Sequence, residues 1–347
     1  MAAVTAPVLT QRQLNRALLA RQLLLRRAAL RLPVALERMG GLQAQYAPSM
    51  YIGLWTRVEG FERDALTRAL VRRAVVQGTL MRSTIHLVSA RDYGPLAAAI
   101  RKGRQEWWLR THRDGPSPRE VAAGARRLRR QLADGPLNSA DLDRLLGKPV
   151  ARAVGQWLHL VRVPPSGTWE RRRADLYAAA EDWLGPADVS PAEGLDHLVR
   201  RYLGGFGPSS LREIAGFAGL PPTEVGPAVD RLRVRRFRSE DGEELVDLPR
   251  GPLPDPDTPA PPRFLPVWDA TLLVHARRTG ILPEEYRARV FNPKTPHSVN
   301  TFLVDGAVAG TWKYEKGRVR IEPFKRLDRT ARRQLDDEAE RLCALHR

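Results

Sequence analysis

The clearest indication of the fold lies in residues 207–248, which read GPSSLREIAGFAGLPPTEVGPAVDRLRVRRFRSEDGEELVDL. Ser210 and Glu213 have the spacing of a capping box, so a helix is predicted to begin there. A Gly-Leu-Pro-Pro turn separates it from a second short helix, and two β-like runs then flank Asp241-Gly242, a typical hairpin turn. A helix, a turn, a helix and a hairpin in this order predict a winged helix.

The same order of elements occurs twice more toward the N-terminus. Asn138 and Asp141 predict a capped helix start, which a second short helix and a basic strand-like segment at 157–163 follow. The first copy contains three helical segments and one strand-like run, at 10–27, 33–39, 61–73 and 81–88. We therefore expect three tandem winged-helix modules, at residues 1–115, 116–190 and 191–248.

The chain changes character after residue 248. Residues 249–262 are rich in proline, which neither a helix nor a central strand tolerates, so we expect a linker or an arm that covers another part of the protein. Beyond it, β-rich runs are predicted at 264–274, 288–291, 299–304, 307–314 and 318–321. Asp305-Gly306 and Lys316-Gly317 should form turns between strands, and a helix should run from Asp328 to the end. Residues 263–347 thus predict a small β-rich domain, and the whole chain an α+β fold.

The composition indicates a polyanionic partner. The 347 residues contain 57 Lys and Arg against 39 Asp and Glu, a net charge of +18, and only six of the 57 are lysines. Guanidinium groups bind phosphate at two points and stack on bases, so this balance favours nucleic acid. GC-rich coding would also raise the ratio of arginine to lysine, but it does not explain the net excess of positive charge.

The composition also excludes several classes of protein. Cys343 is the single cysteine, which rules out an internal disulfide and a cysteine metal cluster. No run approaches the roughly 18 apolar residues that a membrane-spanning helix needs. Residues 1–36 contain no acidic residue, but their helical apolar pattern continues beyond them, which disfavours a cleaved transit peptide. We expect a cytoplasmic protein without a metal or another cofactor.

The common catalytic motifs are absent from the sequence. There is no Walker-type phosphate loop, H-E-x-x-H, G-x-S-x-G or paired C-x-x-C, and the seven histidines lack the spacing of metal ligands. What remains is GGLQAQYAP at residues 40–48. If this segment is extended, Gln43 and Gln45 point the same way and could converge on one group. The spacing alone has little weight, because Gln11 and Gln13 repeat it and a glutamine pair is most often a surface feature.

Several short motifs, in their order along the chain, resemble one family. They are GGLQAQ at 40–45, RSTIHLV at 82–88, RYLGGFGP at 201–208, FLPVWD at 264–269, VDG at 304–306 and GTW at 310–312. Together they span nearly the whole chain and are similar to the AlkZ-like winged-helix DNA glycosylases. The resemblance implies three tandem winged helices followed by a C-terminal β-barrel, which form a C-shaped channel around duplex DNA.

The resemblance also implies a catalytic site and a substrate. The family's catalytic Gln-x-Gln signature falls on Gln43 and Gln45, whereas a related branch has Asp at the second position. Gln45 therefore resembles the specialised branch, which excises bulky natural-product adducts and can unhook interstrand crosslinks, in self-resistance and base excision repair. The expected partner is double-stranded DNA that contains bulky alkyl adducts, bound by a monomer at the bacterial nucleoid.

An amide pair suits one kind of lesion. A purine alkylated at N7 is already cationic, so its glycosidic bond can break without a general acid. The site then has to stabilise an oxocarbenium-like sugar and to position water, whose proton an amide oxygen can accept in a hydrogen bond. A neutral lesion would instead require protonation of the base and a carboxylate near the sugar. The alternative to this reaction is a non-catalytic winged-helix regulator or architectural protein.

Contacts to DNA are predicted first on the segment at 81–88. Arg82, Thr84 and His86 occupy alternate positions of a predicted strand, so their side chains share one face and could approach the DNA backbone. A half-buried strand histidine is the alternative interpretation of His86.

Two further predicted contacts are less specific. Arg171, Arg172 and Arg173 form a basic cluster that suits phosphate, or else a solvated charged run. Lys294 and His297 belong to a polar segment at 292–297 that could probe a groove, or else simply connects two strands.

Overall fold

A computed structural model describes residues 6–275, 277–292 and 298–347 of the chain. It is a mixed α+β structure with three sheets, which confirms the predicted fold class. Three times along the chain a group of helices is followed by an antiparallel pair of strands, whereas the sequence predicts a pair only in the third group and a single strand in each of the first two. The number of winged-helix modules and the domain boundaries stay predictions.

The first group of elements ends at Thr111. It consists of β1 (Val8–Leu9), α1 (Gln11–Arg21), α2 (Leu32–Met39), β2 (Leu42–Gln43), α3 (Ala47–Trp55), α4 (Arg63–Val71), β3 (Val75–Thr79), the 3-10 turn η1 (Met81–Ser83), β4 (Ile85–Ser89) and α5 (Ala90–Thr111). Thr10 and Gln13 form a capping box at the start of α1, where two backbone N–H groups would otherwise lack acceptors.

The second and third groups begin with capped helices as well. The second contains α6 (Pro118–Leu132), β5 (Leu137–Asn138), α7 (Ser139–Leu146), α8 (Lys148–Ala153), the 3-10 turn η2 (Val154–Gln156), β6 (Leu160–Arg162), β7 (Leu176–Ala179) and α9 (Ala180–Leu184). The third contains α10 (Pro191–Phe206), α11 (Leu211–Ala218), α12 (Pro222–Arg231), β8 (Arg235–Ser239) and β9 (Glu244–Asp247). The capping boxes predicted at Asn138 and Asp141 and at Ser210 and Glu213 are both confirmed.

The first two strand pairs join into one sheet. Its order is β2-β4-β3-β6-β7-β5, and the two halves meet where Gln77 pairs with Arg162 and Gly78 with Val161. The third pair, β8 and β9, forms a separate sheet to which β1 adds in parallel. The N-terminal strand therefore ties the start of the chain to its third group of elements.

The C-terminal region contains an open sheet. Its elements are β10 (Arg263–Leu265), α13 (Ala270–Val274), the 3-10 turn η3 (Glu284–Tyr286), α14 (Arg287–Val290), β11 (Thr301–Val304), β12 (Ala307–Glu315), β13 (Arg318–Pro323) and α15 (Arg329–His346). The strands pair in the order β10-β11-β12-β13, and β10 and β13 are not paired with each other. The expected barrel is therefore not confirmed, since a barrel requires its first and last strands to pair.

Both turns predicted in this sheet are confirmed. Asp305 and Gly306 have φ values of 46° and 80°, and Lys316 and Gly317 have 51° and 78°. Two consecutive positive φ values are the geometry of the two-residue hairpin turn that these residues favour. Asp328 caps α15, as the sequence predicts.

Four predicted elements differ from the structure. The helix expected at 10–27 ends at Arg21, and the strand expected at 81–88 begins only at Ile85, after η1. The run 264–274 is a strand only to Leu265 and then becomes α13, which Asp269 caps, while 288–291 lies mainly in α14. Short apolar runs do not distinguish a strand from a buried turn of helix.

Helix α3 is an element that the sequence pattern did not indicate. Every residue from Ala47 to Trp55 is buried, so the helix has no polar face. Because amphipathic periodicity requires a polar face, a helix that is buried all round gives no such signal.

The proline-rich segment covers α1. It contains neither helix nor strand, and its carbonyl oxygens accept hydrogen bonds from three arginines of that helix. Arg12 donates to the carbonyl of Pro256, Arg16 to that of Thr258 and Arg21 to that of Pro252, at 2.7–3.0 Å. Of the two predicted alternatives, a linker or a covering arm, these hydrogen bonds favour the arm.

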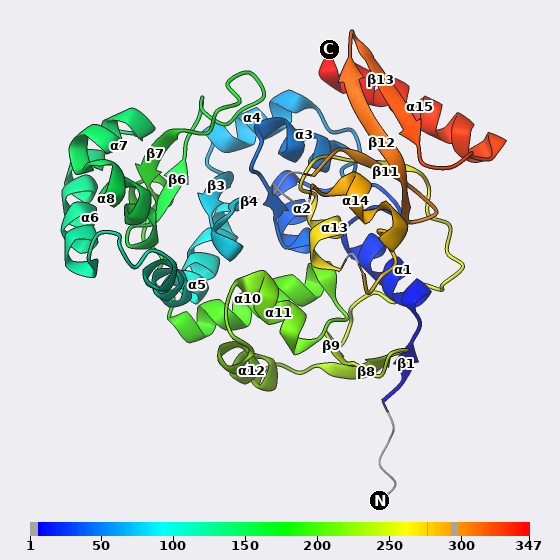
Figure 1. Ribbon diagram of the computed structural model, residues 1–347, viewed down its shortest axis with the longest axis horizontal. Helices are drawn as coiled ribbons and strands as arrows, with labels where there is room; N and C mark the ends of the chain where they lie inside the picture. The colour runs from blue at the N-terminus through cyan, green and yellow to red at the C-terminus, as the bar shows by residue number, and fades with distance from the viewer. Residues whose placement is uncertain (1–5, 276, 293–297) are drawn as a thin grey trace, which may run out of the picture.

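Figure 1 shows how these parts are arranged. Helices α6, α7 and α8 lie at one end of the long axis, and β12, β13 and α15 lie at the other, with β3 and β4 between them. One core of buried apolar residues continues from α1 through α5, α10 and α11 into α13 and β11. Among the described residues, none of the helices has the length and apolar character that crossing a membrane would require.

Candidate functional site

Two glycines turn the chain into the glutamine segment. Gly40 ends α2 in the left-handed conformation, and Gly41 has φ +84°. A Cβ atom at Gly41 would lie 2.9 Å from Cγ1 of Val88 and 3.1 Å from the carbonyl oxygen of Leu87. Only glycine fits here, because any side chain would collide with β4 and strain the backbone. The chain then pairs with β4, Leu42 opposite Leu87 and Gln43 opposite His86.

Both glutamines accept a hydrogen bond from residues 82–85, Gln43 from a side chain and Gln45 from the backbone. Gln43 lies in β2 and is 9% exposed, and its Oε1 accepts a hydrogen bond of 3.4 Å from Nη2 of Arg82. Gln45 lies beyond the end of β2 in a bend, is exposed, and accepts a hydrogen bond of 2.7 Å at Oε1 from the backbone N–H of Ile85. The predicted extended segment is confirmed for Gln43, but the strand does not continue to Gln45.

The turn that holds both glutamines has an unusual backbone. Arg82 and Ser83 have φ values of 53° and 56°, which side chains with a Cβ rarely adopt and which cost free energy. The backbone carbonyl of Thr84 accepts a hydrogen bond from Leu80, and its hydroxyl donates to the carbonyl of Met81 at 3.0 Å. The prediction that Arg82, Thr84 and His86 alternate along one strand is therefore wrong, since the strand starts after Thr84.

The Arg82 side chain connects this turn to α11. Its guanidinium lies 5.3 Å from the ring centroid of Phe217 and 3.5 Å from the Phe217 carbonyl oxygen. Burial lowers the pKa of Arg82, but a guanidinium remains protonated at neutral pH. No carboxylate of the described residues forms an ion pair with it. The site thus contains one half-buried cation without an ion-pair partner in the part of the chain that the structure describes.

His86 lies beneath the site and is not on the surface. It is 3% exposed, its ring packs against Phe217 at 6.4 Å between centroids, and its Nδ1 lies 3.0 Å from the Thr84 carbonyl. Burial, with the nearby charge of Arg82, lowers its pKa to about 3, so the ring is neutral at physiological pH. His86 is thus more deeply buried than the half-buried strand histidine of the alternative interpretation, and its contact with DNA stays a prediction.

The predicted arginine cluster lies beside the glutamine segment. Arg171, Arg172 and Arg173 are exposed on the connection between β6 and β7. Nη1 of Arg172 donates to the hydroxyl of Tyr46 at 3.0 Å, while Arg173 forms an ion pair of 2.8 Å with Asp175. The structure therefore brings Arg172, but not Arg173, to the residue that follows Gln45.

Lys294 and His297 lie outside the described residues. Sequence reasoning missed Tyr46 and Phe217, which contact the predicted arginines. Phe217 is more than 130 residues away from Arg82, and no local pattern relates the two. Within the described ranges, there is also no group of three or more His, Cys, Asp or Glu residues that could hold a metal ion.

This arrangement favours chemistry by oriented neutral dipoles. Oε1 of Gln43 accepts an N–H of the Arg82 side chain, and Oε1 of Gln45 accepts the backbone N–H of Ile85. Each oxygen has a second lone pair available, since a carbonyl oxygen can accept twice. No described carboxylate touches Gln43, Gln45 or Arg82, and His86 does not titrate near neutral pH. The site can therefore orient water or a cationic group, but it has no side chain suited to general acid catalysis.

Comparisons with known proteins show which family and which solved structure the chain resembles. A family model described as "DNA glycosylase AlkZ-like" matches residues 36–345. The fold is similar to the solved structure of the Streptomyces sahachiroi DNA glycosylase AlkZ, with a TM-score of 0.81, 18% sequence identity and 97% of each chain covered. A search of the curated proteins finds no match.

Proposed function

The chain belongs to the AlkZ-like DNA glycosylase family, and from this premise we propose that it hydrolyses the N-glycosidic bond of N7-alkylated purines that carry bulky adducts. The product is an abasic site. The observation that carries the proposal is the pair of glutamine oxygens bonded to one turn, where no described carboxylate forms a hydrogen bond with them and the nearby His86 stays neutral.

The positive charge of the lesion removes the need for a general acid, which the site lacks. An N7-alkylpurine is positively charged, so the departing base is neutral and needs no proton from the protein. The remaining task is to stabilise the developing positive charge on the sugar and to place a water molecule against it. Oriented amide oxygens do both, because the negative end of each dipole faces the reacting centre.

Each residue near the site then has a distinct role. Gln43 is held by Arg82 and Gln45 by the backbone of Ile85, which fixes both amides before the substrate arrives. Arg82 and Arg172 supply positive charge for DNA phosphates next to the lesion. The ring of Phe217 packs against both His86 and the guanidinium of Arg82, and this packing holds the turn in place.

We extend the proposal to the biological substrate on the identity of Gln45. The absence of a carboxylate at this position accords with the branch that removes bulky natural-product adducts and unhooks interstrand crosslinks. On this proposal the protein acts as a monomer on duplex DNA at the nucleoid, in self-resistance and base excision repair.

A single-turnover assay tests the proposal. The substrate is a duplex with one bulky N7-alkylguanine adduct, and the readout is the abasic site, which hot alkali converts to a strand break. Wild type should release the base, and a cationic adduct should be released much faster than a neutral base in the same duplex. If wild type releases no base from any such adduct, the proposal fails and a non-catalytic DNA-binding protein becomes the better interpretation.

A further inference from the structure

A second site lies at the other end of α3. A cavity of about 590 Å³ is lined by residues from four distant parts of the chain: the segment after α1, the end of α3 with the turn that follows, the end of the proline-rich arm with β10, and α15. Gln45 precedes α3 and Trp55 ends it. A helix of nine residues rises about 13 Å, so this cavity is separate from the glutamine site.

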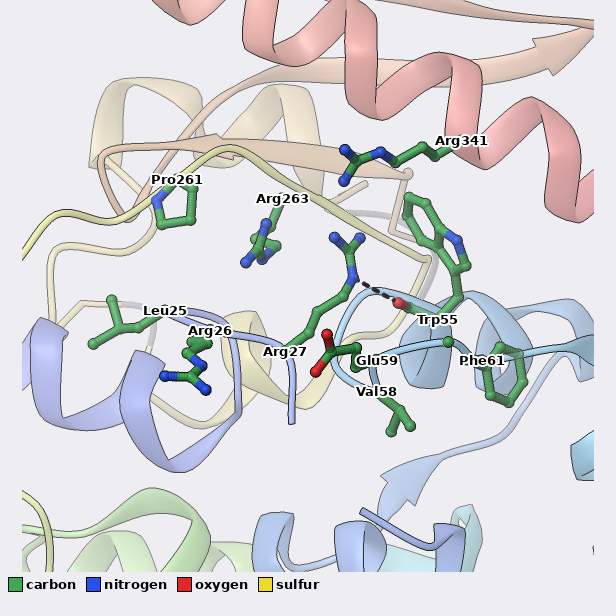
Figure 2. A pocket seen from close by; sticks show the side chains of 11 residues that line it. Leu25, Arg26, Arg27, Trp55, Val58, Glu59, Phe61, Pro261, Arg263 and Arg341 are labelled. Carbon is green, nitrogen blue, oxygen red and sulfur yellow. Dashed lines mark hydrogen bonds between the residues drawn. The ribbon is translucent and has the colours of Figure 1, made fainter. Parts of the chain in front are cut away.

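The walls of the cavity carry an excess of positive charge. Arg26, Arg27, Arg263 and Arg341 line it, together with the carboxylate of Glu59. In the view of Figure 2 the guanidinium groups of Arg27, Arg263 and Arg341 converge on one region, with the indole of Trp55 beside them.

Three of these arginines share one buried carboxylate. Glu338 is 5% exposed and bonds directly to Arg27, and it lies 3.9 Å from Arg263 and 3.7 Å from Arg341. With Glu59 included, four guanidinium groups face two carboxylates, which leaves two positive charges uncompensated. Burial, with the charges of Arg27 and Arg341, lowers the pKa of Arg263 to about 10, so it is still protonated at neutral pH.

The four arginines differ in how many hydrogen bonds they donate to other residues of the protein. Arg27 donates to the carbonyl of Trp55 at 3.0 Å, and Arg263 donates to the carbonyls of Leu24 and Pro262. The guanidinium groups of Arg26 and Arg341 donate no hydrogen bond to any residue that the structure describes. Figure 2 places these two on opposite sides of the cavity. Arg26 can therefore turn its donors to a ligand without breaking a hydrogen bond inside the protein, and Arg341 would give up only its 3.7 Å ion pair with Glu338.

The remaining wall is apolar. Leu25, Val58, Phe61 and Pro261 line the cavity beside the arginines, and the guanidinium of Arg27 lies 4.8 Å from the ring centroid of Trp55. Arginines bind phosphate through paired N–H donors, and an apolar, aromatic wall accommodates a flat ring. A cavity of this volume holds a ligand larger than a single phosphate ion.

From these observations we propose that the cavity binds a nucleotide unit, with its phosphate on the arginines and its base against the apolar wall. The unit belongs either to a DNA strand or to a free nucleotide, and the two sources share this chemistry. This site is additional to the proposed glycosylase site, and binding alone reports on it, so its test does not depend on base release.

Calorimetry with the full chain tests the proposal, using dAMP, deoxyadenosine and inorganic phosphate as probes. The test variant is the double substitution Arg26→Gln with Arg341→Gln, and the control is Arg31→Gln with Arg333→Gln. All four arginines are exposed, and the control removes the same charge outside the cavity. We expect dAMP to bind wild type and the control equally and the double variant about tenfold more weakly or worse, with little binding of deoxyadenosine. Glu59→Gln should strengthen dAMP binding, because it removes a nearby negative charge.

Undamaged duplex distinguishes the two sources. If a DNA strand occupies the cavity, duplex competes with dAMP, and the slope of log affinity against log salt becomes shallower by about 0.9 for each lost phosphate contact in the double variant only. If a free nucleotide occupies it, duplex neither competes nor changes its salt slope, while dAMP binding is still lost. The proposal is overturned if dAMP binds the double variant as well as the control, or if wild type binds no dAMP and duplex binding is the same in both variants.

Discussion

The two ends of α3 lie next to different kinds of polar group. Near the start of the helix, two neutral amides and one half-buried guanidinium meet at a strained turn, without a carboxylate partner among the described residues. At the end of the helix, four guanidinium groups and the carboxylate of Glu59 line a cavity, and the buried carboxylate of Glu338 lies beside three of the four. The first arrangement orients each amide by a hydrogen bond, whereas the second gathers four arginines around one cavity. Oriented neutral groups suit a reacting centre, whereas an excess of positive charge suits the binding of phosphate.

The largest expected effect is on the glutamines. Gln43→Ala and Gln45→Ala should each slow single-turnover base release by about 2–4 kcal/mol of barrier, since each removes an oriented polar group from the reacting centre. Affinity for undamaged duplex, measured by fluorescence anisotropy, should remain near that of wild type. Gln334→Ala on the exposed face of α15 is the matched control. Gln13 does not serve as one, because its side chain completes the capping box of α1. Full activity in both site variants would remove Gln43 and Gln45 from the mechanism.

A second prediction separates backbone strain from crowding at the glutamine segment. Gly41→Ala should lower the free energy of unfolding by about 1–3 kcal/mol and slow base release, because the new Cβ meets β4 and displaces β2. Gly242→Ala is the control, since its φ of +82° is nearly the same as the +84° of Gly41 but its Cβ would meet nothing within 4 Å. Urea unfolding compares the two. Equal losses of stability would mean that contact with Val88 and Leu87 does not position the site.

The third prediction concerns the cation that holds Gln43. Arg82→Ala should slow base release by about 1 kcal/mol, the usual contribution of one hydrogen bond, and should weaken duplex binding modestly. Arg333→Ala removes an exposed arginine of α15 and should change neither quantity. A loss of duplex affinity without any change in the rate of base release would assign Arg82 to phosphate binding alone.

The smallest expected effect is that of pH. His86 has a pKa of about 3 and stays neutral above that value, and no carboxylate contacts the glutamines among the described residues. The rate constant of base release from a cationic adduct should therefore be level between about pH 6 and pH 8, because nothing at the site gains or loses a proton there. The rate should also be the same with a chelator present. A bell-shaped profile centred near neutral pH would indicate a titrating catalytic group that the glutamine mechanism does not contain.

Local signals in the sequence predicted local structure well. The capping boxes at Asn138 and Ser210 and the turns at Asp305-Gly306 and Lys316-Gly317 involve groups within three residues of one another. Their geometry depends on few other parts of the chain, so the sequence specifies them. The proline-rich arm belongs to the same class, because proline alone excludes helix and central strand.

The candidate site was predictable only in part. Gln43 and Gln45 could be singled out by the family resemblance, but their spacing on a strand was not the reason they meet one turn of the chain. That turn depends on Arg82, whose positive φ no pattern predicts, and on Phe217 from a different part of the sequence. The partnership of Arg172 with Tyr46 likewise joins residues that are far apart in the chain.

The sequence by itself determined several helix caps, the hairpin turns of the C-terminal sheet and the net positive charge, since each depends on residue type and short spacing. Tertiary structure decided how these pieces combine. The edges of β3 and β6 each present backbone groups that need partners, and any strand edge could supply them; only the packing of the complete chain selects the pairing of Gln77 with Arg162. The same packing brings Arg27 and Arg263 to Glu338, because long-range contacts are fixed by shape and burial and not by sequence distance. Only the third arginine, Arg341, is a local neighbour of Glu338, three residues further along α15.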